Sequence, residues 1–285
     1  MTISQQWYTI SLSGIPNYKE AIMNPKIALI QMSSIFAEPE KNFSHAIELM
    51  DEAMAQKPDI LVLPETFNTG FFPTDNLEEL ADKEGQTTKK LFSEYAKKHS
   101  VNIVAGSVTT LKNNKVFNTA YIFDKHGKLV AEYDKIHGFT PSGEHNYYQG
   151  GNKLVTFNLA GMKCGIIICY DIRFCELVRS LALKGIELLF IPAHWPLIRK
   201  NHWINLATTR AIENQMYVCA VNACSKAGDT IFGGNSLLIN PWGEEICHLD
   251  EAEEVQFGTV DLSIIKDIRE SINVFRDRKP SLYEL

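Results

Sequence analysis

The sequence predicts an α/β fold in which helices cover mixed β-sheets. Short apolar segments typical of strands alternate with amphipathic segments typical of helices along the 285 residues. Other strand-like segments are joined by the turns "LKNNK", "DKHGK" and "NPWGE", which favour hairpins. No shift in composition and no linker divides the chain, and 45% apolar residues suffice for a large core. These observations predict a single layered α/β domain.

The strand-like segments are bounded by turn residues and are rich in branched apolar side chains. In chain order they are Lys26–Met32, Asp59–Leu63, Asn102–Val108, Asn118–Phe123, Leu129–Asp134, Lys153–Leu159, Met162–Cys169, Ile186–Ile191, Tyr217–Asn222, Ser236–Asn240 and Gly258–Leu262. Some follow helices and others follow tight turns, so the pattern predicts both parallel and antiparallel pairing.

The helices are predicted from apolar residues that recur every three or four positions. This spacing occurs in Glu40–Lys57, where Phe43, Ala46, Ile47, Met50 and Met54 form one stripe, and in Thr87–His99 and His202–Gln215. A further stripe begins at Phe174, and Gly185 ends that helix.

Charge and hydropathy exclude several classes of function. The chain has 28 Lys and Arg against 34 Asp and Glu, a net charge of −6 without a basic tract. Such a chain is a poor partner for nucleic acid or an anionic membrane. No apolar segment approaches the roughly 20 residues that span a bilayer.

The first 24 residues differ from the rest. Regular patterning begins only at Lys26, and the segment lacks the basic start and uninterrupted apolar core of a secretory signal. We expect residues 1–24 to form a poorly ordered N-terminal extension and residues 25–285 to form the domain. Translation from Met23 is the alternative, and the sequence leaves both open.

The six cysteines do not have the spacing of a metal or disulfide site. Cys164 and Cys169 are five residues apart on one strand, as are Cys219 and Cys224 on another. An odd offset places two strand side chains on opposite faces. No C-x-x-C pair is present, so we expect no metal and reduced thiols in the cytoplasm.

Cys169 lies where a predicted strand breaks into a helix, in "KCGIIICYDIRFCELVRSLALKG". Enzymes often hold a nucleophile at such a corner, beside helix N–H groups. A buried, inert cysteine is the alternative, and position alone does not separate the two.

Two other predicted strands also end on reactive side chains. Glu65 follows a strand in "DILVLPETFNTGF", and Lys135 follows another in "LVAEYDKIHGFTPSGEHNYY". Taken singly, each is more often a solvated surface residue than part of a site.

The motifs L-P-E-x-F, Y-D-K-x-H-x-F and C-Y-D-x-R-F-x-E, in this order, resemble the nitrilase superfamily of carbon–nitrogen hydrolases. The later segment "PAHWPLIRKNHWINLATTRAIENQMYVCAVNACS" makes the chain most similar to the ω-amidase branch. The resemblance extends from Lys26 to about Tyr283. It implies a four-layer α-β-β-α sandwich of two mixed sheets and a Glu–Lys–Cys triad without metal or cofactor. It also implies a cytoplasmic homodimer in which residues 273–285 pack on the partner subunit.

The resemblance also assigns catalytic roles. Cys169 would be the nucleophile, because a thiol can attack a carbonyl once its proton is removed. Glu65 would accept that proton, donate one to the departing ammonia, and then activate the water that cleaves the thioester. Lys135 would favour the thiolate and, with the Tyr170 backbone N–H, stabilise the oxyanion. Glu144 would support Lys135 or the attacking water.

Substrate binding is assigned less directly. Related carbamoyl-amino-acid hydrolases use an arginine at the position of Arg173 to bind a carboxylate, and an ion pair with Asp171 or Glu176 is the structural alternative. His194 and Trp195 are expected to line the pocket, although core packing would equally explain Trp195.

Three residues near the motifs bear on the details. His137 is expected to support its loop through hydrogen bonds rather than to form a Cys–His dyad. Gly138 stands where the family usually has Leu, which would loosen or enlarge the pocket. Cys175 stands where it usually has Pro, in the first turn of a helix, with little expected consequence.

The predicted activity is hydrolysis of a small carboxylate-bearing amide with release of ammonia. The alternatives within the superfamily are an N-carbamoyl-amino-acid amidase and a deaminated-glutathione amidase, and a nitrilase fits the ω-amidase-like segment less well. A non-catalytic binding protein is disfavoured because all three triad positions are filled.

Overall fold

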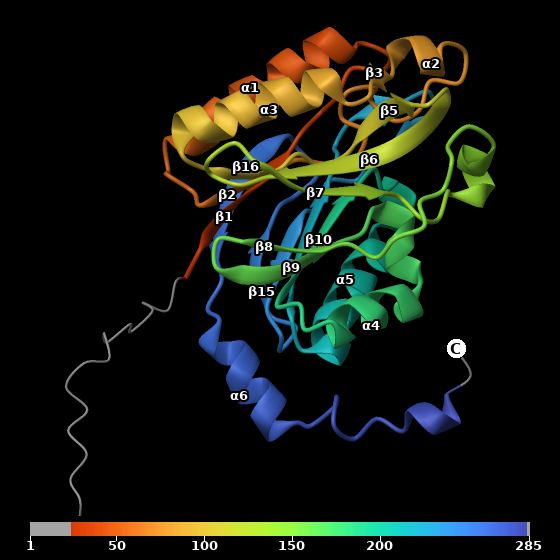
Figure 1. Ribbon diagram of the computed structural model, residues 1–285. Helices are drawn as coiled ribbons and strands as arrows, with labels where there is room; N and C mark the ends of the chain where they lie inside the picture. Colours follow the sequence, from red (N-terminus) through yellow and green to blue (C-terminus); the bar gives the residue numbers. More distant parts are fainter. Residues whose placement is uncertain (1–23, 284–285) are drawn as a thin grey trace, which may run out of the picture.

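Two β-sheets pack face to face, and helices cover the outer face of each in the computed structural model (Figure 1). The structure describes residues 24–283. The predicted extension, apart from Asn24, lies outside the described residues. Helices α1 (Pro39–Met54) and α3 (Gln86–His99) cover the first sheet, and α4 (Cys175–Leu183) and α5 (Lys200–Asn214) cover the second.

Both sheets mix parallel and antiparallel strands, as predicted. The first has the order β16 (Glu254–Thr259), β1 (Lys26–Gln31), β2 (Ile60–Val62), β4 (Asn102–Val104), β6 (Lys115–Phe123), β5 (Val108–Lys112) and β3 (Asp82–Lys83), with β7 (Leu129–Asp134) also paired to β6. The second has the order β15 (Glu245–His248), β14 (Leu237–Ile239), β11 (Tyr217–Asn222), β10 (Leu188–Ala193), β9 (Met162–Ile166) and β8 (Thr156–Leu159).

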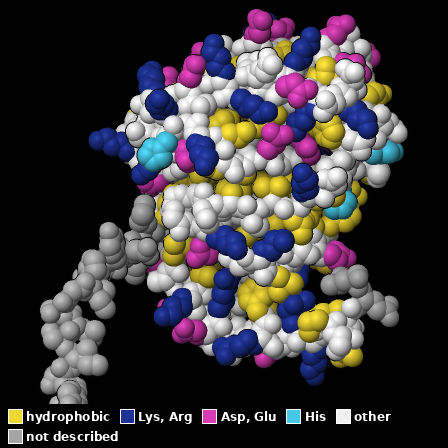
Figure 2. All heavy atoms as spheres, viewed as in Figure 1, with side chains coloured by type: hydrophobic (Ala, Val, Ile, Leu, Met, Phe, Trp, Pro, Cys, Tyr) yellow, Lys and Arg dark blue, Asp and Glu magenta, His cyan; other side chains and the backbone are white. Residues whose placement is uncertain are grey.

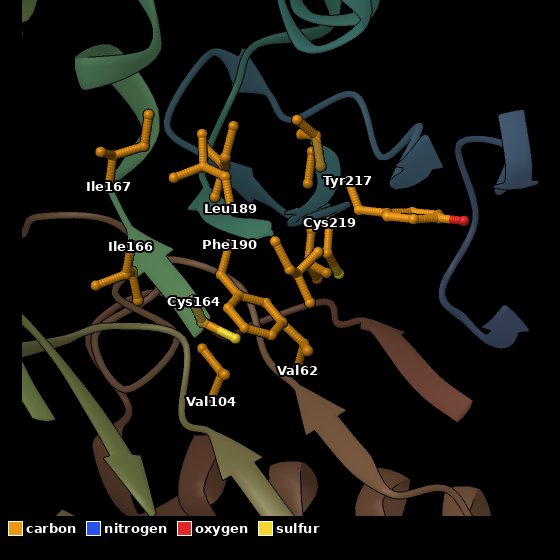
Figure 3. Packing of buried hydrophobic residues seen from close by; sticks show 14 of the residues in the cluster. Val62, Val104, Cys164, Ile166, Ile167, Leu189, Phe190, Tyr217 and Cys219 are labelled. Atoms are coloured by element: carbon orange, nitrogen blue, oxygen red, sulfur yellow. The ribbon is translucent and has the colours of Figure 1, made fainter. Parts of the chain in front are cut away.

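The space between the sheets is filled by apolar side chains from both. Figure 3 shows Val62 and Val104 of the first sheet facing Cys164, Ile166 and Phe190 of the second. All five are fully buried. Because strand side chains alternate, the opposite face of each sheet is free to pack on helices, which produces the four layers.

Strand direction gathers the ends of four strands at one edge of the sandwich. Strands β2 and β4 are parallel to each other. Strands β4 and β7 are both antiparallel to β6, so β2 and β7 run in the same direction. Strands β9 and β10 are parallel in the second sheet. The carboxyl ends of parallel strands are where α/β folds usually place their ligands.

The predicted helices are present with small shifts at their ends. Helix α1 ends at Met54, three residues before the predicted Lys57. Lys57 has a left-handed φ of +50° and precedes Pro58, and neither feature fits a continuing helix. Cys175 is the first residue of α4, as the sequence predicted.

Five predicted strands were wrong in extent by three residues or more. Strand β6 begins at Lys115 and not at Asn118, β8 begins at Thr156 and not at Lys153, and β9 ends at Ile166 and not at Cys169. The last strand spans Glu254–Thr259 and not Gly258–Leu262, because it pairs antiparallel with the whole of β1. The segment predicted as Asn102–Val108 divides into β4 and β5. Gly106 separates them with φ +53°, and a Cβ there would lie 1.9 Å from the Pro64 carbonyl oxygen.

The C-terminal segment was not predicted to contain a helix. Helix α6 (Ser263–Ser271) buries Ile265 and Ile268, and the chain then runs along the end of the molecule that carries α4 (Figure 1). Figure 2 shows hydrophobic side chains among Lys and Arg side chains at this end. Within residues 24–283, no helix is both long and apolar enough to span a membrane.

Candidate active site

A cavity of about 460 Å³ opens at the edge of the sandwich where β2, β7, β9 and β10 end. Most of its wall is apolar and aromatic, including Phe71, Phe139, Pro196 and Ile231. The polar lining includes seven of the eight predicted site residues, namely Lys135, Glu144, Cys169, Tyr170, Arg173, His194 and Trp195. An apolar cavity with a few convergent polar groups is typical of a small-molecule site.

Lys135 joins the two predicted carboxylates beneath this cavity. Its Nζ donates to Glu65 Oε1 at 2.8 Å and to Glu144 Oε1 and Oε2 at 2.8 and 2.9 Å. The three side chains are nearly inaccessible to solvent. Lys135 follows β7 and Glu65 follows β2, while Glu144 begins the short 3₁₀ helix η2 (Glu144–Asn146). The fold therefore brings Glu65 to the Lys135–Glu144 pair, although Glu65 precedes Lys135 by 70 residues.

The Glu65 carboxylate is held at both oxygens. Asn118 Nδ2 also donates to Oε1 at 2.7 Å, and the His194 backbone N–H donates to Oε2 at 2.7 Å. Burial alone would raise the pKa of Glu65, but the charge of Lys135 and the hydrogen bonds from Lys135 and from the His194 backbone N–H outweigh it and lower the pKa below its usual value. Glu65 is therefore a carboxylate at neutral pH.

Lys135 and His194 are also fixed in their charge states. Burial would lower the pKa of Lys135, but Glu144 and Glu65 raise it well above its usual value. Burial lowers the pKa of His194 to about 4, so its imidazole is neutral at pH 7. The site accordingly contains one permanent cation between two carboxylates.

Cys169 lies at the corner after β9 and opens the 3₁₀ helix η3 (Cys169–Arg173). Its φ of +47° is in the left-handed region, which is strained for a residue with a Cβ. Burial raises the pKa of the Cys169 thiol well above its usual value, Glu65 adds to the rise, and Lys135 offsets only part of it. The predicted effect of Lys135 on the thiolate has the right sign, but the resting group is a thiol.

The predicted binding residues surround Cys169. Arg173 places its guanidinium 4.8 Å from the Trp195 ring centroid and contacts His202 Nδ1 at 3.3 Å. Within residues 24–283 it forms no ion pair with Asp171 or Glu176, the alternative that the sequence left open.

Trp195 and His194 belong both to the cavity and to the core. Trp195 lines the cavity, and it is also 3% exposed and packs against Trp203 with ring centroids 5.6 Å apart. It therefore contributes both to the pocket wall and to the core. The His194 ring lies between Thr66 Oγ1 and Ser225 Oγ, at 3.2 and 3.4 Å.

Sequence reasoning missed three residues of the site. Asn118 binds Glu65, Arg199 lines the cavity with its guanidinium 5.2 Å from the Phe139 ring centroid, and Asp171 joins two loops. Arg199 lies in the segment that resembles the ω-amidase branch, but its neighbours in the sequence do not indicate a cavity position. Only the assembled fold identifies these roles.

Gly138 does not enlarge the cavity, contrary to the prediction. It is absent from the lining, and a Cβ there would lie 3.0 Å from the His145 Cα. The missing side chain allows the η2 turn, which carries Glu144, to approach the Lys135 loop closely. His137 hydrogen-bonds to Asp171 at 2.8 Å and stacks on Phe174.

No cluster in the described residues suits a metal ion. Within residues 24–283, no group of three or more His, Cys, Asp or Glu side chains has the arrangement of a metal site. All six cysteines are free thiols.

The strain at Cys169 gives a stability prediction. Cys169→Gly should be more stable than Cys169→Ala by about 1 kcal/mol, because glycine adopts a left-handed φ without a steric cost. The control is Ala182→Gly in α4, where glycine should destabilise by about 1 kcal/mol. Chemical denaturation of the variants measures both differences, and equal stability of the two Cys169 variants would contradict the strain.

Known proteins resemble this chain over nearly its whole length. The Carbon-nitrogen hydrolase family profile matches residues 26–270. The 2-oxoglutaramate amidase of Bacillus subtilis (strain 168) is 42% identical over 257 residues, covering 90% of this chain and 98% of that protein. Omega-amidase NIT2 of Homo sapiens is 34% identical over 272 residues, covering 90% and 96%.

Solved structures agree with the fold. A CN-hydrolase superfamily protein from Xanthomonas campestris with an arsenic adduct in its active site superposes with a TM-score of 0.85 at 27% identity, covering 92% of this chain and 99% of that one. Nit3 of Saccharomyces cerevisiae, a member of the nitrilase superfamily, gives 0.83 at 27% identity, covering 91% and 97%. The chain thus belongs to the carbon–nitrogen hydrolase family of the nitrilase superfamily.

Proposed function

We propose that the protein is an ω-amidase that hydrolyses the terminal amide of a small carboxylate-bearing compound such as 2-oxoglutaramate. The observation that carries the proposal is the buried Glu65–Lys135–Glu144 cluster beside Cys169 at an apolar cavity. The relatives of this chain that are named 2-oxoglutaramate amidase and Omega-amidase NIT2 support the choice of substrate.

Acylation begins from the neutral thiol of Cys169 and the carboxylate of Glu65. As sulfur attacks the amide carbonyl, Glu65 accepts the thiol proton, so no free thiolate has to accumulate. The negative charge that develops on the carbonyl oxygen is stabilised by the Lys135 ammonium and the Tyr170 backbone N–H. Glu65 then returns the proton to the leaving nitrogen, and ammonia departs from a thioester.

Deacylation uses the same groups with water as nucleophile. Glu65 accepts a proton from the water as it attacks the thioester, Lys135 again stabilises the oxyanion, and the proton returns to the sulfur of Cys169. The net reaction consumes one amide and one water and yields one carboxylic acid and one ammonia. Glu144 keeps Lys135 charged and directed toward the reacting carbonyl.

The cavity also suits a carboxylate at the far end of the substrate. Arg173 and Arg199 each rest on an aromatic wall and carry no carboxylate partner among residues 24–283. A guanidinium placed over an aromatic ring in this way can bind a carboxylate through two parallel hydrogen bonds. The apolar wall between them accommodates a short carbon chain.

The role of Arg173 is tested by two substrates of equal length, succinamate and butyramide. Arg173→Gln should lower kcat/KM for succinamate by about 10- to 100-fold, since a hydrogen bond to a charged group contributes about 1.5–3 kcal/mol. Butyramide should change by less than about threefold. Lys200→Gln, which removes an exposed cation bound to Glu251, is the control. An equal loss for both amides would assign Arg173 a structural role.

An ammonia-release screen tests the proposed reaction. The panel contains ω-amides, N-carbamoyl amino acids and nitriles, with wild type and Cys169→Ala assayed in parallel. We expect turnover of ω-amides that carry a carboxylate. A preference for carbamoyl compounds or nitriles would replace the ω-amidase assignment by one of the other branches.

We further propose a cytoplasmic homodimer in which residues 273–285, the last two of which lie outside the described residues, pack on the partner subunit. The free cysteines support a reducing compartment, and exposed Leu282 and Tyr283, at 74% and 46%, support an apolar contact of the tail. Light scattering should give about twice the chain mass of 32.2 kDa, and truncation after Asn273 should lower it. A monomeric full chain would contradict the dimer.

A further inference from the structure

A single buried carboxylate connects the loop of Lys135 to the turn of Cys169. Asp171 is fully buried and accepts four hydrogen bonds. Its Oδ1 binds the His137 backbone N–H at 3.0 Å and the His137 ring Nδ1 at 2.8 Å. Its Oδ2 binds the Tyr133 hydroxyl at 2.6 Å and the Ile168 backbone N–H at 3.0 Å.

The donors to Asp171 lie close in the sequence to the two reactive residues. Tyr133 and His137 stand two residues before and two residues after Lys135. The remaining donor comes from the residue before Cys169, and Asp171 itself stands two residues after it. Lys135 follows a strand of the first sheet and Cys169 follows a strand of the second. Asp171 therefore bridges the two sheets beside the cavity that Lys135 and Cys169 both line.

We propose that Asp171 is a positioning residue that sets the separation between the Lys135 ammonium and the Cys169 sulfur. Asp171 is absent from the cavity lining, so it acts through these two residues and not on the substrate. Its bond to the Ile168 N–H also fixes the start of the strained turn at Cys169. This inference relies on the roles proposed above for Lys135 and Cys169.

A second contact stiffens the same bridge. The His137 ring stacks on Phe174 with centroids 3.6 Å apart and an interplanar angle of 11°. Phe174 directly follows η3, the 3₁₀ turn that begins at Cys169. The ring Nδ1 of His137 lies 2.8 Å from Asp171 Oδ1, so the ring is held by the carboxylate on one side and by Phe174 on its face. The His137 ring thus connects Asp171 to Phe174 at the end of the turn that begins at Cys169.

The test substitution is Asp171→Asn, which keeps the shape of the side chain. An amide has one acceptor oxygen, so at least one backbone N–H, of His137 or of Ile168, loses its partner in either orientation. We expect kcat for the ω-amide to fall by about 100-fold, a loss typical of a small misplacement of catalytic groups, with KM changed less than about threefold.

A double-mutant cycle separates positioning from general structural support. If Asp171 acts by aligning Lys135 with Cys169, Asp171→Asn should cause little further loss of kcat in a Lys135→Gln background. A full additional 100-fold loss in that background, or a kcat within twofold of wild type in the single variant, would overturn the proposal.

Thiol chemistry provides a readout that does not depend on amidase activity. Methyl methanethiosulfonate should modify Cys169 more slowly at pH 8 in Asp171→Asn, because Lys135 no longer promotes the thiolate. In the Lys135→Gln background, Asp171→Asn should leave this rate unchanged. If wild type hydrolyses no amide, the proposed function fails while this measurement still decides the positioning role. An unchanged rate in the single variant would contradict it.

Tyr133→Phe serves if Asp171→Asn does not fold. It removes one bond to Asp171 and leaves the carboxylate and both backbone N–H contacts in place. We expect Tyr133→Phe to lower kcat three- to tenfold. In the Lys135→Gln background the same substitution should leave kcat unchanged. Wild-type kcat, or an additive loss in the double variant, would overturn the proposal.

Discussion

Cys169→Ala is expected to abolish amide hydrolysis while leaving the fold intact. The substitution removes the sulfur that would form the thioester, and loss of a nucleophile typically lowers kcat by at least about 10⁴-fold. The measurement is ammonia release from 2-oxoglutaramate under saturating substrate. The free energy of unfolding should change by only about 1 kcal/mol, because the side chain loses a single heavy atom.

Two controls make this result specific to Cys169. Cys175→Ala removes an exposed thiol at the start of α4 and should retain full activity. Cys219→Ala removes a buried thiol of β11, so it should cost stability but not the chemical step. Substantial ammonia release by Cys169→Ala would refute the assignment of the nucleophile.

Lys135→Gln is expected to impair both the reaction and the fold. Loss of an oxyanion donor typically lowers kcat by about 10²–10³-fold. The change also leaves Glu65 and Glu144 buried without a cation, and breaking a buried ion pair typically costs about 3–5 kcal/mol. Ammonia release and chemical denaturation measure the two effects. Lys200→Gln, whose ion pair with Glu251 has the same 2.8 Å length at the surface, should cost less than about 1 kcal/mol.

The stability loss in Lys135→Gln should depend on pH in a defined direction. Without Lys135, burial and mutual repulsion raise the folded-state carboxylate pKa above the unfolded value of about 4.3. The folded variant then binds more protons than the unfolded chain, so its stability falls as pH rises above that value. In wild type the pKa of Glu65 is lowered, so its contribution to stability is lost only as pH falls below the unfolded value and is constant above it. The difference in stability between variant and wild type should thus be larger at pH 8 than at pH 5, and a constant difference would contradict the cluster.

The layered fold was predictable because apolar periodicity depends on local sequence. The helices α3 and α5 agree with their predicted ranges to within two residues, since both have clear stripes and a left-handed residue at or just after the end. The last strand was misplaced because its boundary depends on pairing with β1, more than 220 residues away in the chain. Helix α6 was missed because its short apolar face becomes visible only against the core.

The site was predictable where a reactive side chain follows a strand within a known motif. Glu65, Lys135 and Cys169 satisfy that condition, and the structure places them together. Asn118 and Asp171 could not be assigned in this way, because their importance comes from hydrogen bonds to residues tens of positions away. The raised pKa of the Cys169 thiol likewise comes from burial and from Glu65, which only the folded arrangement determines.

The most direct measurement is the intact mass of enzyme quenched in acid during turnover, with ammonia assayed in the same samples. We predict that wild type gains the mass of the ω-amide minus ammonia, that the adduct maps to the peptide containing Cys169, and that Cys169→Ala shows neither adduct nor ammonia. Ammonia formation with the acyl group on another residue, or undiminished turnover by Cys169→Ala, would contradict a thioester mechanism at this site.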